Sequence, residues 1–437
     1  MGFKEAEKYL FSLGIDAMKA SKPSLHRIEA LCEVLDHPER TVPAIHVTGT
    51  NGKTSTARIT SSLLTAAGLS VGTYTSPHLE SIRERIALNG EPISEDVFGE
   101  VFDHLMPILQ LVENKLGEQV SFFELLTAMF FLWTAESGID VAVVEVGLGG
   151  RWDATNVMDA PVSVITNVGL DHTGLMGKNR TSIAREKSGI VKPAATLVSA
   201  ERDPSIIKVI EEEISEFEVT TSFIDREWHL LENRVALGGR YFSMKSSGTA
   251  YEGLFVPLHG AHQGINAGTA VEAVTRFLPA RTLEEELIIE GLASAAVPGR
   301  IETLRPKGRA TVVMDVAHNP DGLSALVSAL IEEFAFERIH FVLGILGDKD
   351  FTGMLTELTR VPCTVYVTEP NGVKAVPPVE LSKAAAGIGL DALQVDDPFA
   401  ASQRAIEMAE PDELVCITGS HYVVGEVRTR VIDLVLS

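Results

Sequence analysis

Residues 45–58, IHVTGTNGKTSTAR, bring small, amide and basic side chains together in an order that can hold phosphate. The common phosphate-binding loop has Gly, four residues and then Gly-Lys-Ser/Thr. Here Val47 stands at the position of the first glycine, and the first glycine of this stretch is Gly49. The flanking sequence predicts a strand, a glycine-containing turn and a helix, so that backbone N–H groups and the helix dipole face an anion. A chance Gly-Lys-Thr in a surface loop is therefore the weaker interpretation. The residues predicted to bind the phosphates are Gly49, Thr50, Asn51, Gly52, Lys53, Thr54 and Ser55.

A carboxylate inside an apolar run is the second feature with chemical potential. Glu145 lies near the end of DVAVVEV (140–146), and a buried acid needs a partner. Close to the carboxyl end of a strand, in a sheet that also carries the phosphate loop, it is well placed for Mg²⁺, which Thr54 or Ser55 can also face. A salt bridge to Arg151 is the alternative.

Asp171 and His172 follow the next apolar run, in VGLDHTG (168–174), and would lie at the same edge of the sheet. A lone histidine is more often a structural hydrogen-bonding group than a metal ligand, and both interpretations stay open for His172. Three nearby glycines do not have the Gly-x-Gly-x-x-Gly spacing of a dinucleotide-binding turn, which excludes that interpretation. They are Gly147, Gly149 and Gly150.

The elements that position these residues follow an α/β pattern, because apolar runs alternate with amphipathic stretches from residue 41 onward. Residues 222–257 instead predict hairpins, followed by helices at about 263–278 and 283–296. A Pro-Gly break in AVPGRIE (296–302) precedes a second α/β series, and we place the domains at 1–297 and 298–437. The predicted strands are 43–48, 70–75, 140–146, 162–168, 310–316, 339–345, 363–368 and 413–418, and the first helices are 53–68 and 124–136.

Length and composition agree with two domains and limit the function. The chain has 437 residues, of which 45% are hydrophobic, and a formal net charge of −23. Such a charge argues against nucleic acid or an anionic membrane as partner, although local cations can still serve a small anionic substrate. The three cysteines have no zinc-site spacing, the N-terminus lacks an apolar signal core, and no apolar run reaches membrane length. We expect a cytoplasmic protein.

Ten motifs in order give the sequence a family resemblance, and the likeness runs from Leu25 to Arg428. It resembles the folylpolyglutamate synthase/dihydrofolate synthase family, a branch of the Mur-type ligases, in which the short Gly-Thr-Asn-Gly-Lys-Thr loop is usual. The resemblance implies a P-loop-containing, Mur-ligase-like central domain with a mostly parallel sheet and a smaller Rossmann-like α/β C-terminal domain. The motifs are HVTGTNGKTS, YTSPHL, EVGLGGRWDATN, LDHTG, IAREKSGIVKP, HQGINA, PGRIE, DVAHNP, GDKD and TGSHYVVGEVR.

The resemblance also implies an activity. ATP phosphorylates a carboxylate of a folate or dihydropteroate, and the amino group of L-glutamate attacks the acyl phosphate. Mg²⁺ is the expected metal, a monovalent cation is a further expectation, and we expect a monomer that can act as both synthases. The implied metal ligands are Ser76, Glu145, His172 and Lys187, of which the last three and Lys53 form the catalytic set. Further ATP-binding residues are Asn266, Arg300, Asp315 and His318, and the folate or pteroate site comprises Phe123, Trp152, Asp153 and Ala154.

Lys187 raises a charge problem that the resemblance solves. An ammonium about 4 Å from a unit positive charge is destabilised by about 4 kcal/mol at an effective dielectric constant of about 20, and by more beside Mg²⁺. In the family this lysine is carbamylated, which makes it an anionic ligand. An unmodified lysine on a helix surface is the alternative. Likewise, Asp315 can be an ordinary strand-end cap and Phe123 an ordinary core residue.

Three details depart from the family pattern, the first being Ser24 at a position that is often Gly, and two other functions compete. Trp152 stands where a smaller Leu is common, and His421 replaces a usual apolar residue in TGSHY. A Mur-type ligase acting on a cell-wall precursor is disfavoured by LGGRWDATN and TGSHYVVGEVR, and we expect no UDP-binding domain ahead of the loop. A nucleotide-binding module without catalysis would not need Lys53, Glu145, His172 and Lys187 together.

Overall fold

The computed structural model describes residues 2–14, 24–171, 173–246, 248–278 and 283–436. These residues form two compact units that exchange segments along the chain. The first unit runs to Glu232 and includes Phe242–Phe255 and Ile265–Ala295, whereas the second comprises Asn233–Tyr241, Val256–Gly264 and the chain from Ala296. The predicted domains, 1–297 and 298–437, are each a single stretch of chain. The two segments Asn233–Tyr241 and Val256–Gly264 of the second unit were therefore not predicted.

The first unit is built on an eight-stranded sheet in the order β4-β3-β2-β5-β1-β6-β7-β8. The neighbouring strands β2-β5-β1-β6-β7-β8 all pair in parallel. β3 and β4 add an antiparallel edge next to β2. Every residue of β1, β5 and β6 is buried, as expected for parallel strands covered on both faces. The strands are β1 (Ala44–Thr48), β2 (Val71–Tyr74), β3 (Ile86–Leu88), β4 (Glu91–Pro92), β5 (Val141–Glu145), β6 (Val162–Ile165), β7 (Thr196–Ser199) and β8 (Thr220–Phe223).

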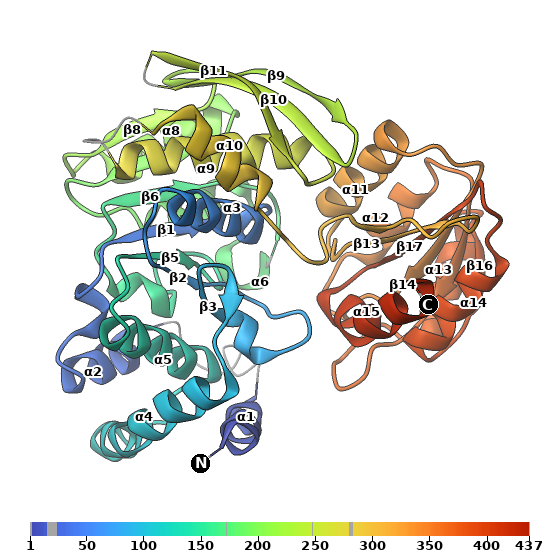
Figure 1. Ribbon diagram of the computed structural model, residues 1–437. Helices are drawn as coiled ribbons and strands as arrows, with labels where there is room; N and C mark the ends of the chain where they lie inside the picture. Colours follow the sequence, from blue (N-terminus) through green and yellow to red (C-terminus); the bar gives the residue numbers. More distant parts are fainter. Residues whose placement is uncertain (1, 15–23, 172, 247, 279–282, 437) are drawn as a thin grey trace. The chain divides into compact units, whose positions relative to one another are not determined.

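Helices cover both faces of this sheet (Figure 1). α3 (Lys53–Ala66) and α10 (Glu285–Ala293) pack together on one face. α5 (Phe122–Glu136) lies on the other face among buried aromatic and aliphatic side chains, because it is apolar nearly all round. The remaining helices of the unit are α1 (Phe3–Ser12), α2 (His26–Val34), α4 (Glu95–Leu116), α6 (Thr173–Met176), α7 (Arg180–Ser188) and α8 (Pro204–Ile214), with most of α9 (Ala261–Phe277).

The predicted hairpins are confirmed as a separate three-stranded sheet in the order β11-β10-β9. Its strands are β9 (Trp228–Ala236), β10 (Gly239–Ser246) and β11 (Thr249–Val256).

The second unit carries a six-stranded sheet in the order β12-β13-β17-β14-β15-β16. All pairs are parallel except β12 with β13. Helices cover both faces here too, so the predicted α/β fold class with mostly parallel sheets is confirmed (Figure 1). The elements are β12 (Glu302–Leu304), β13 (Thr311–Met314), α11 (Pro320–Glu333), β14 (Ile339–Leu343), α12 (Phe351–Leu358), β15 (Cys363–Val367), α13 (Pro378–Gly387), β16 (Asp391–Gln394), α14 (Pro398–Met408), β17 (Leu414–Thr418) and α15 (His421–Leu436).

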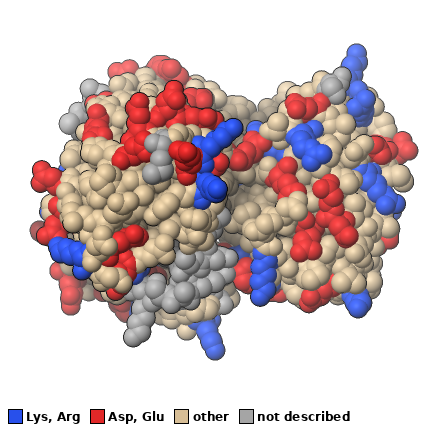
Figure 2. Space-filling model, turned by 90° about the horizontal axis from the view of Figure 1, so that it is seen from below, with Lys and Arg blue, Asp and Glu red and all other residues tan. Residues whose placement is uncertain are grey.

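The surface agrees with the strongly negative composition. On the face drawn in Figure 2, acidic side chains are spread widely, and basic side chains form only small separate groups. Within the described residues, no helix combines the length and apolarity needed to cross a membrane.

Candidate active site

The predicted phosphate loop connects β1 to α3, and its two glycines are required by geometry. Gly52 has φ +83° at the N-terminus of α3, a left-handed conformation that favours glycine. A Cβ on Gly49 would lie 1.8 Å from the Thr166 hydroxyl oxygen, which no side chain can tolerate. The backbone can therefore turn sharply here, and the N–H groups of the first helical turn point the same way.

Asn167 holds this loop in shape, and the sequence reasoning missed it. Its side-chain oxygen accepts the backbone N–H groups of Thr50 at 3.2 Å and Asn51 at 3.0 Å. The neighbouring Thr166 hydroxyl donates to the Asn51 carbonyl at 2.6 Å. The available signal was the polar pair immediately after β6, because the carboxyl ends of neighbouring parallel strands meet at one edge.

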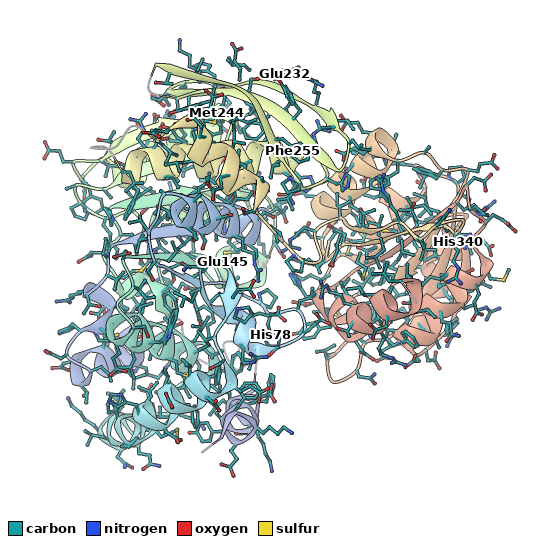
Figure 3. All side chains as sticks on the ribbon, in the orientation of Figure 1. His78, Glu145, Glu232, Met244, Phe255 and His340 are labelled. Atoms are coloured by element: carbon teal, nitrogen blue, oxygen red, sulfur yellow. The ribbon has the colours of Figure 1, made fainter. Side chains whose placement is uncertain are left out.

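Glu145 lies beside the loop at the end of β5 and is 1% exposed (Figure 3). Its carboxylate accepts the Thr54 hydroxyl at 2.9 Å and the Ser76 backbone N–H at 3.1 Å. The alternative salt bridge to Arg151 is wrong, since Arg151 pairs with Glu213 at 2.9 Å. Three predicted residues from distant parts of the chain thus meet at the carboxyl edge of the sheet.

Two lysines reach into the same loop. Nζ of Lys53 donates to the carbonyl oxygens of Gly49 at 3.1 Å and Thr50 at 3.3 Å. Nζ of Lys187, on α7, donates to the same Gly49 oxygen at 2.8 Å. Lys187 is only 2% exposed, so the alternative of a surface lysine is wrong. Burial, together with the nearby Lys53 charge, lowers the pKa of Lys187 to about 7.

The arrangement fits a magnesium ion. Among the described residues no three His, Cys, Asp or Glu side chains form a metal cluster, and the predicted ligand His172 lies outside those residues. Mg²⁺, however, usually takes one or two carboxylates and completes its shell with water and substrate phosphates. Glu145 and the Thr54 hydroxyl supply such oxygen donors beside the phosphate loop, with Ser76 adjacent.

The four residues predicted to bind the folate or pteroate differ in accessibility. Phe123 is half-buried, and a Cβ added to Gly147 would lie 2.5 Å from its ring. Trp152 is 47% exposed. Asp153 is fully buried instead, and Ala154 is buried in the core.

The carboxylate of Asp153 holds the 147–155 loop together. It accepts the Leu148 N–H at 2.8 Å and both the N–H and the hydroxyl of Thr155 at 3.1 and 2.5 Å. Burial raises the pKa of Asp153 to about 6, although the hydrogen bonds from Thr155 and the backbone oppose the shift. The structure thus gives Asp153 a loop-holding role, and its contact with a substrate stays a prediction.

The remaining predicted ATP-binding residues fall into both units. Asn266 lies on α9 in the first unit. Its side-chain oxygen is so close to Gly52 that a Cβ added to Gly52 would lie 2.5 Å from that oxygen. The other three belong to the second unit and are Arg300, Asp315 and His318.

In the second unit Asp315 follows β13 and is buried. Its carboxylate accepts the backbone N–H groups of Ile301 at 2.9 Å and Ala317 at 2.8 Å, which is the geometry of a strand-end cap. Burial raises the pKa of Asp315, and the charge of Arg300 opposes that shift.

His421 joins this group, although the sequence reasoning gave it no role. Its Nε2 lies 3.4 Å from Nη2 of Arg300, and its ring centroid lies 5.3 Å from that of His318. The second unit thus gathers one arginine and two histidines near the carboxyl end of β13, a composition suited to an anion.

Known proteins share this architecture over nearly the whole chain. The Mur ligase middle domain matches residues 47–274, and the Mur ligase, glutamate ligase domain matches residues 299–421. A Mycobacterium tuberculosis protein named dihydrofolate synthase/folylpolyglutamate synthase is 38% identical over 439 residues, covering 93% of this chain and 90% of that protein.

Solved structures agree. Mycobacterium tuberculosis folylpolyglutamate synthase complexed with ADP has a TM-score of 0.92 at 36% identity, with 98% of each chain covered. E. coli FolC in complex with DHPP and ADP has a TM-score of 0.88 at 28% identity, with 100% of this chain and 99% of that chain covered. The extended likeness in sequence and in fold, and the two matched domains, have one explanation: the chain belongs to the folylpolyglutamate synthase/dihydrofolate synthase family of the Mur ligases.

Proposed function

We propose that this protein is an ATP-dependent ligase that joins L-glutamate to a folate, to dihydropteroate or to both. A substrate carboxylate attacks the γ-phosphorus of ATP, ADP leaves, and the glutamate amine then displaces phosphate from the acyl phosphate to form the amide. The observation that carries the proposal is the meeting of Lys53, Glu145 and Lys187 around one phosphate loop.

The loop residues account for the nucleotide end of the reaction. The first-turn N–H groups of α3 and its dipole bind phosphate oxygens, and Lys53 neutralises charge as the γ-phosphoryl group moves. Glu145, Thr54 and Ser76 would hold Mg²⁺, which when bound screens the repulsion between the substrate carboxylate and ATP. His172 is proposed as a further ligand by family resemblance, and so is the monovalent cation as a cofactor.

Carbamylation of Lys187 belongs to the same proposal. The neutral amine attacks carbon dioxide, an N–C bond forms and the amine loses a proton, leaving an anionic carbamate. A pKa of about 7 keeps about half of the amine neutral at pH 7, far more than for an ordinary lysine. The product would remove the repulsion from Lys53 and would offer an oxygen ligand to the metal.

The acceptor site is proposed at Phe123 and the Trp152–Ala154 turn. A half-buried and an exposed aromatic side chain suit a flat heterocycle. One solved relative is described as a complex with DHPP and ADP, which is in keeping with a pterin-bearing substrate at such a site.

The decisive experiment measures ADP release by the purified protein with ATP, Mg²⁺ and L-glutamate, comparing dihydropteroate with tetrahydrofolate. ADP release that needs both glutamate and one pterin-bearing substrate is the expected result, and the comparison assigns the preference. Turnover with a UDP-linked cell-wall precursor instead would establish the competing ligase activity. ATP binding without turnover on any acceptor would indicate a module without catalysis.

A further inference from the structure

The loop that carries Trp152 packs unusually closely against the C-terminal end of α7. A Cβ on Gly149 would lie 3.0 Å from Cγ of Glu186, and one on Gly150 would lie 2.8 Å from the Glu186 carbonyl oxygen. Gly149 also has φ +73°, so glycine suits both its conformation and its contact. The two glycines let the loop backbone lie directly on Glu186.

Hydrogen bonds hold this contact at several points. The backbone N–H of Arg151 donates to the Glu186 carbonyl at 2.9 Å, and that of Trp152 donates to Oε1 of the Glu186 side chain at 3.3 Å. A third link comes from Asn156, whose side-chain amide donates to the Gly189 carbonyl at 3.0 Å. Only the bond to Trp152 depends on the identity of the side chain at position 186.

The same loop is tied to the phosphate loop on its other side. The Thr48 hydroxyl, at the end of β1, donates to the Gly149 carbonyl at 2.7 Å. The next residue, Gly49, accepts Nζ of Lys187. Glu186 therefore lies where the Trp152 turn, the phosphate loop and the helix carrying Lys187 meet.

We propose that Glu186 is a positioning residue that sets the Trp152 turn against the helix carrying Lys187 and so determines affinity for the pterin-bearing substrate. The inference rests on the proposed function. Because Glu186 is half-buried and its carboxylate accepts the backbone N–H of Trp152, we expect its side chain to affect the acceptor and not ATP. An amide oxygen accepts an N–H as a carboxylate does, so the bond to Trp152 should survive in Glu186→Gln and be lost in Glu186→Ala.

The test compares Glu186→Ala and Glu186→Gln with the full-length protein, and uses Arg185→Ala as a matched control. Arg185 is the neighbouring residue on α7, with an exposed side chain paired to Glu213. Two quantities are measured: the Kd for tetrahydrofolate and for dihydropteroate in the presence of ADP, and the KM values for acceptor and ATP with kcat. We expect Glu186→Ala to raise the acceptor Kd and KM about tenfold, with Glu186→Gln and Arg185→Ala within about twofold of the unmodified protein.

A KM for ATP that changes by less than about twofold is the second expected result, because loss of general structure would raise all constants together. An unchanged acceptor Kd in Glu186→Ala would overturn the inference, as would an equal loss in Glu186→Gln. If the proposed function is wrong, the unmodified protein will show no glutamate-dependent ADP release. The comparison of Kd values among the variants would still decide the role of Glu186.

Discussion

At the scale of single residues, two ammonium groups share one carbonyl oxygen. Lys53, on α3, and Lys187, on α7, both donate to the carbonyl of Gly49. In water this repulsion would be slight, but burial of Lys187 makes its charged form unfavourable. The site therefore favours either a neutral Lys187 or a modified one beside Lys53.

Lys53→Ala and Glu145→Ala should each lower kcat by at least about 100-fold, because each removes a charge aimed at the phosphates or at the metal that accompanies them. Circular dichroism should show the fold retained. Lys115→Ala, at an exposed position of α4, is the control and should keep full activity. Near-normal ligation in either site variant would contradict the mechanism.

The lowered pKa of Lys187 predicts a pH dependence of activation. In protein freed of carbon dioxide, activity should be low and should return on addition of bicarbonate at constant dissolved carbon dioxide. The rate of return should rise as pH increases through about 7, because only the neutral amine reacts. Equal rates at about pH 6 and about pH 8 would exclude a role for this amine.

The same shift has a consequence for stability, and its sign is fixed by linkage. The unfolded chain binds the Lys187 proton up to a pKa near 10.5, whereas the folded chain releases it near 7. The free energy of unfolding should therefore rise with pH between these values in bicarbonate-free buffer. In Lys187→Met, the free energy of unfolding measured by urea denaturation should not show this rise with pH. An identical pH profile in the variant and the unmodified protein would contradict the prediction.

At the scale of elements, the unit that matters is the strand, the turn and the helix that follows. β1 and α3 were predictable because a buried apolar run and a 3.6-residue periodicity are local properties of the sequence. The turn between them depends on backbone conformations that only glycine adopts readily and on an approach to Thr166 that admits no side chain. Its geometry should therefore respond to a single methyl group.

Gly49→Ala should destabilise the protein by about 3 kcal/mol or more, because the added Cβ overlaps the Thr166 hydroxyl. Gly68→Ala, at the other end of the same helix, is the matched control, since it has φ +83° but open space around its Cβ. Its expected cost is about 1–2 kcal/mol, from backbone conformation alone. Urea denaturation compares the two, and equal costs would show that the overlap relaxes.

At the scale of the whole molecule, the second unit is assembled from segments that are not contiguous in the chain. Arg240 is 1% exposed, and it pairs at 2.9 Å with Glu333, whose side chain is fully buried. His259, from another inserted segment, adds a contact to Glu333 at 2.7 Å, and the Gly260 N–H adds one at 2.8 Å. Burial alone would raise the pKa of Glu333, but these partners outweigh it and lower the pKa.

Glu333→Gln should therefore lower the stability of the second unit by about 3 kcal/mol, because it leaves Arg240 buried without its full partner. Glu332→Gln is the control, since Glu332 pairs with the same arginine but has a side chain 45% exposed, and its cost should be within about 0.5 kcal/mol. Because two units need not unfold together, the midpoint of each urea transition is the quantity to compare. Equal midpoints for the two variants would mean that the inserted segments contribute little.

Local patterns in the sequence determined the α/β class, the strands that carry the site, the phosphate loop, Glu145 and the hairpins after residue 222, because periodicity and glycine placement act over a few residues. Only the tertiary structure decided which side chains are buried and what they face. Asn167 contacts Asn51 across 116 positions, Lys187 reaches Gly49 across 138, and Arg240 reaches Glu333 across 93. A hydrogen bond or a lowered pKa depends on distance and on exclusion of water, and neither is recorded in the order of the residues until the chain has folded.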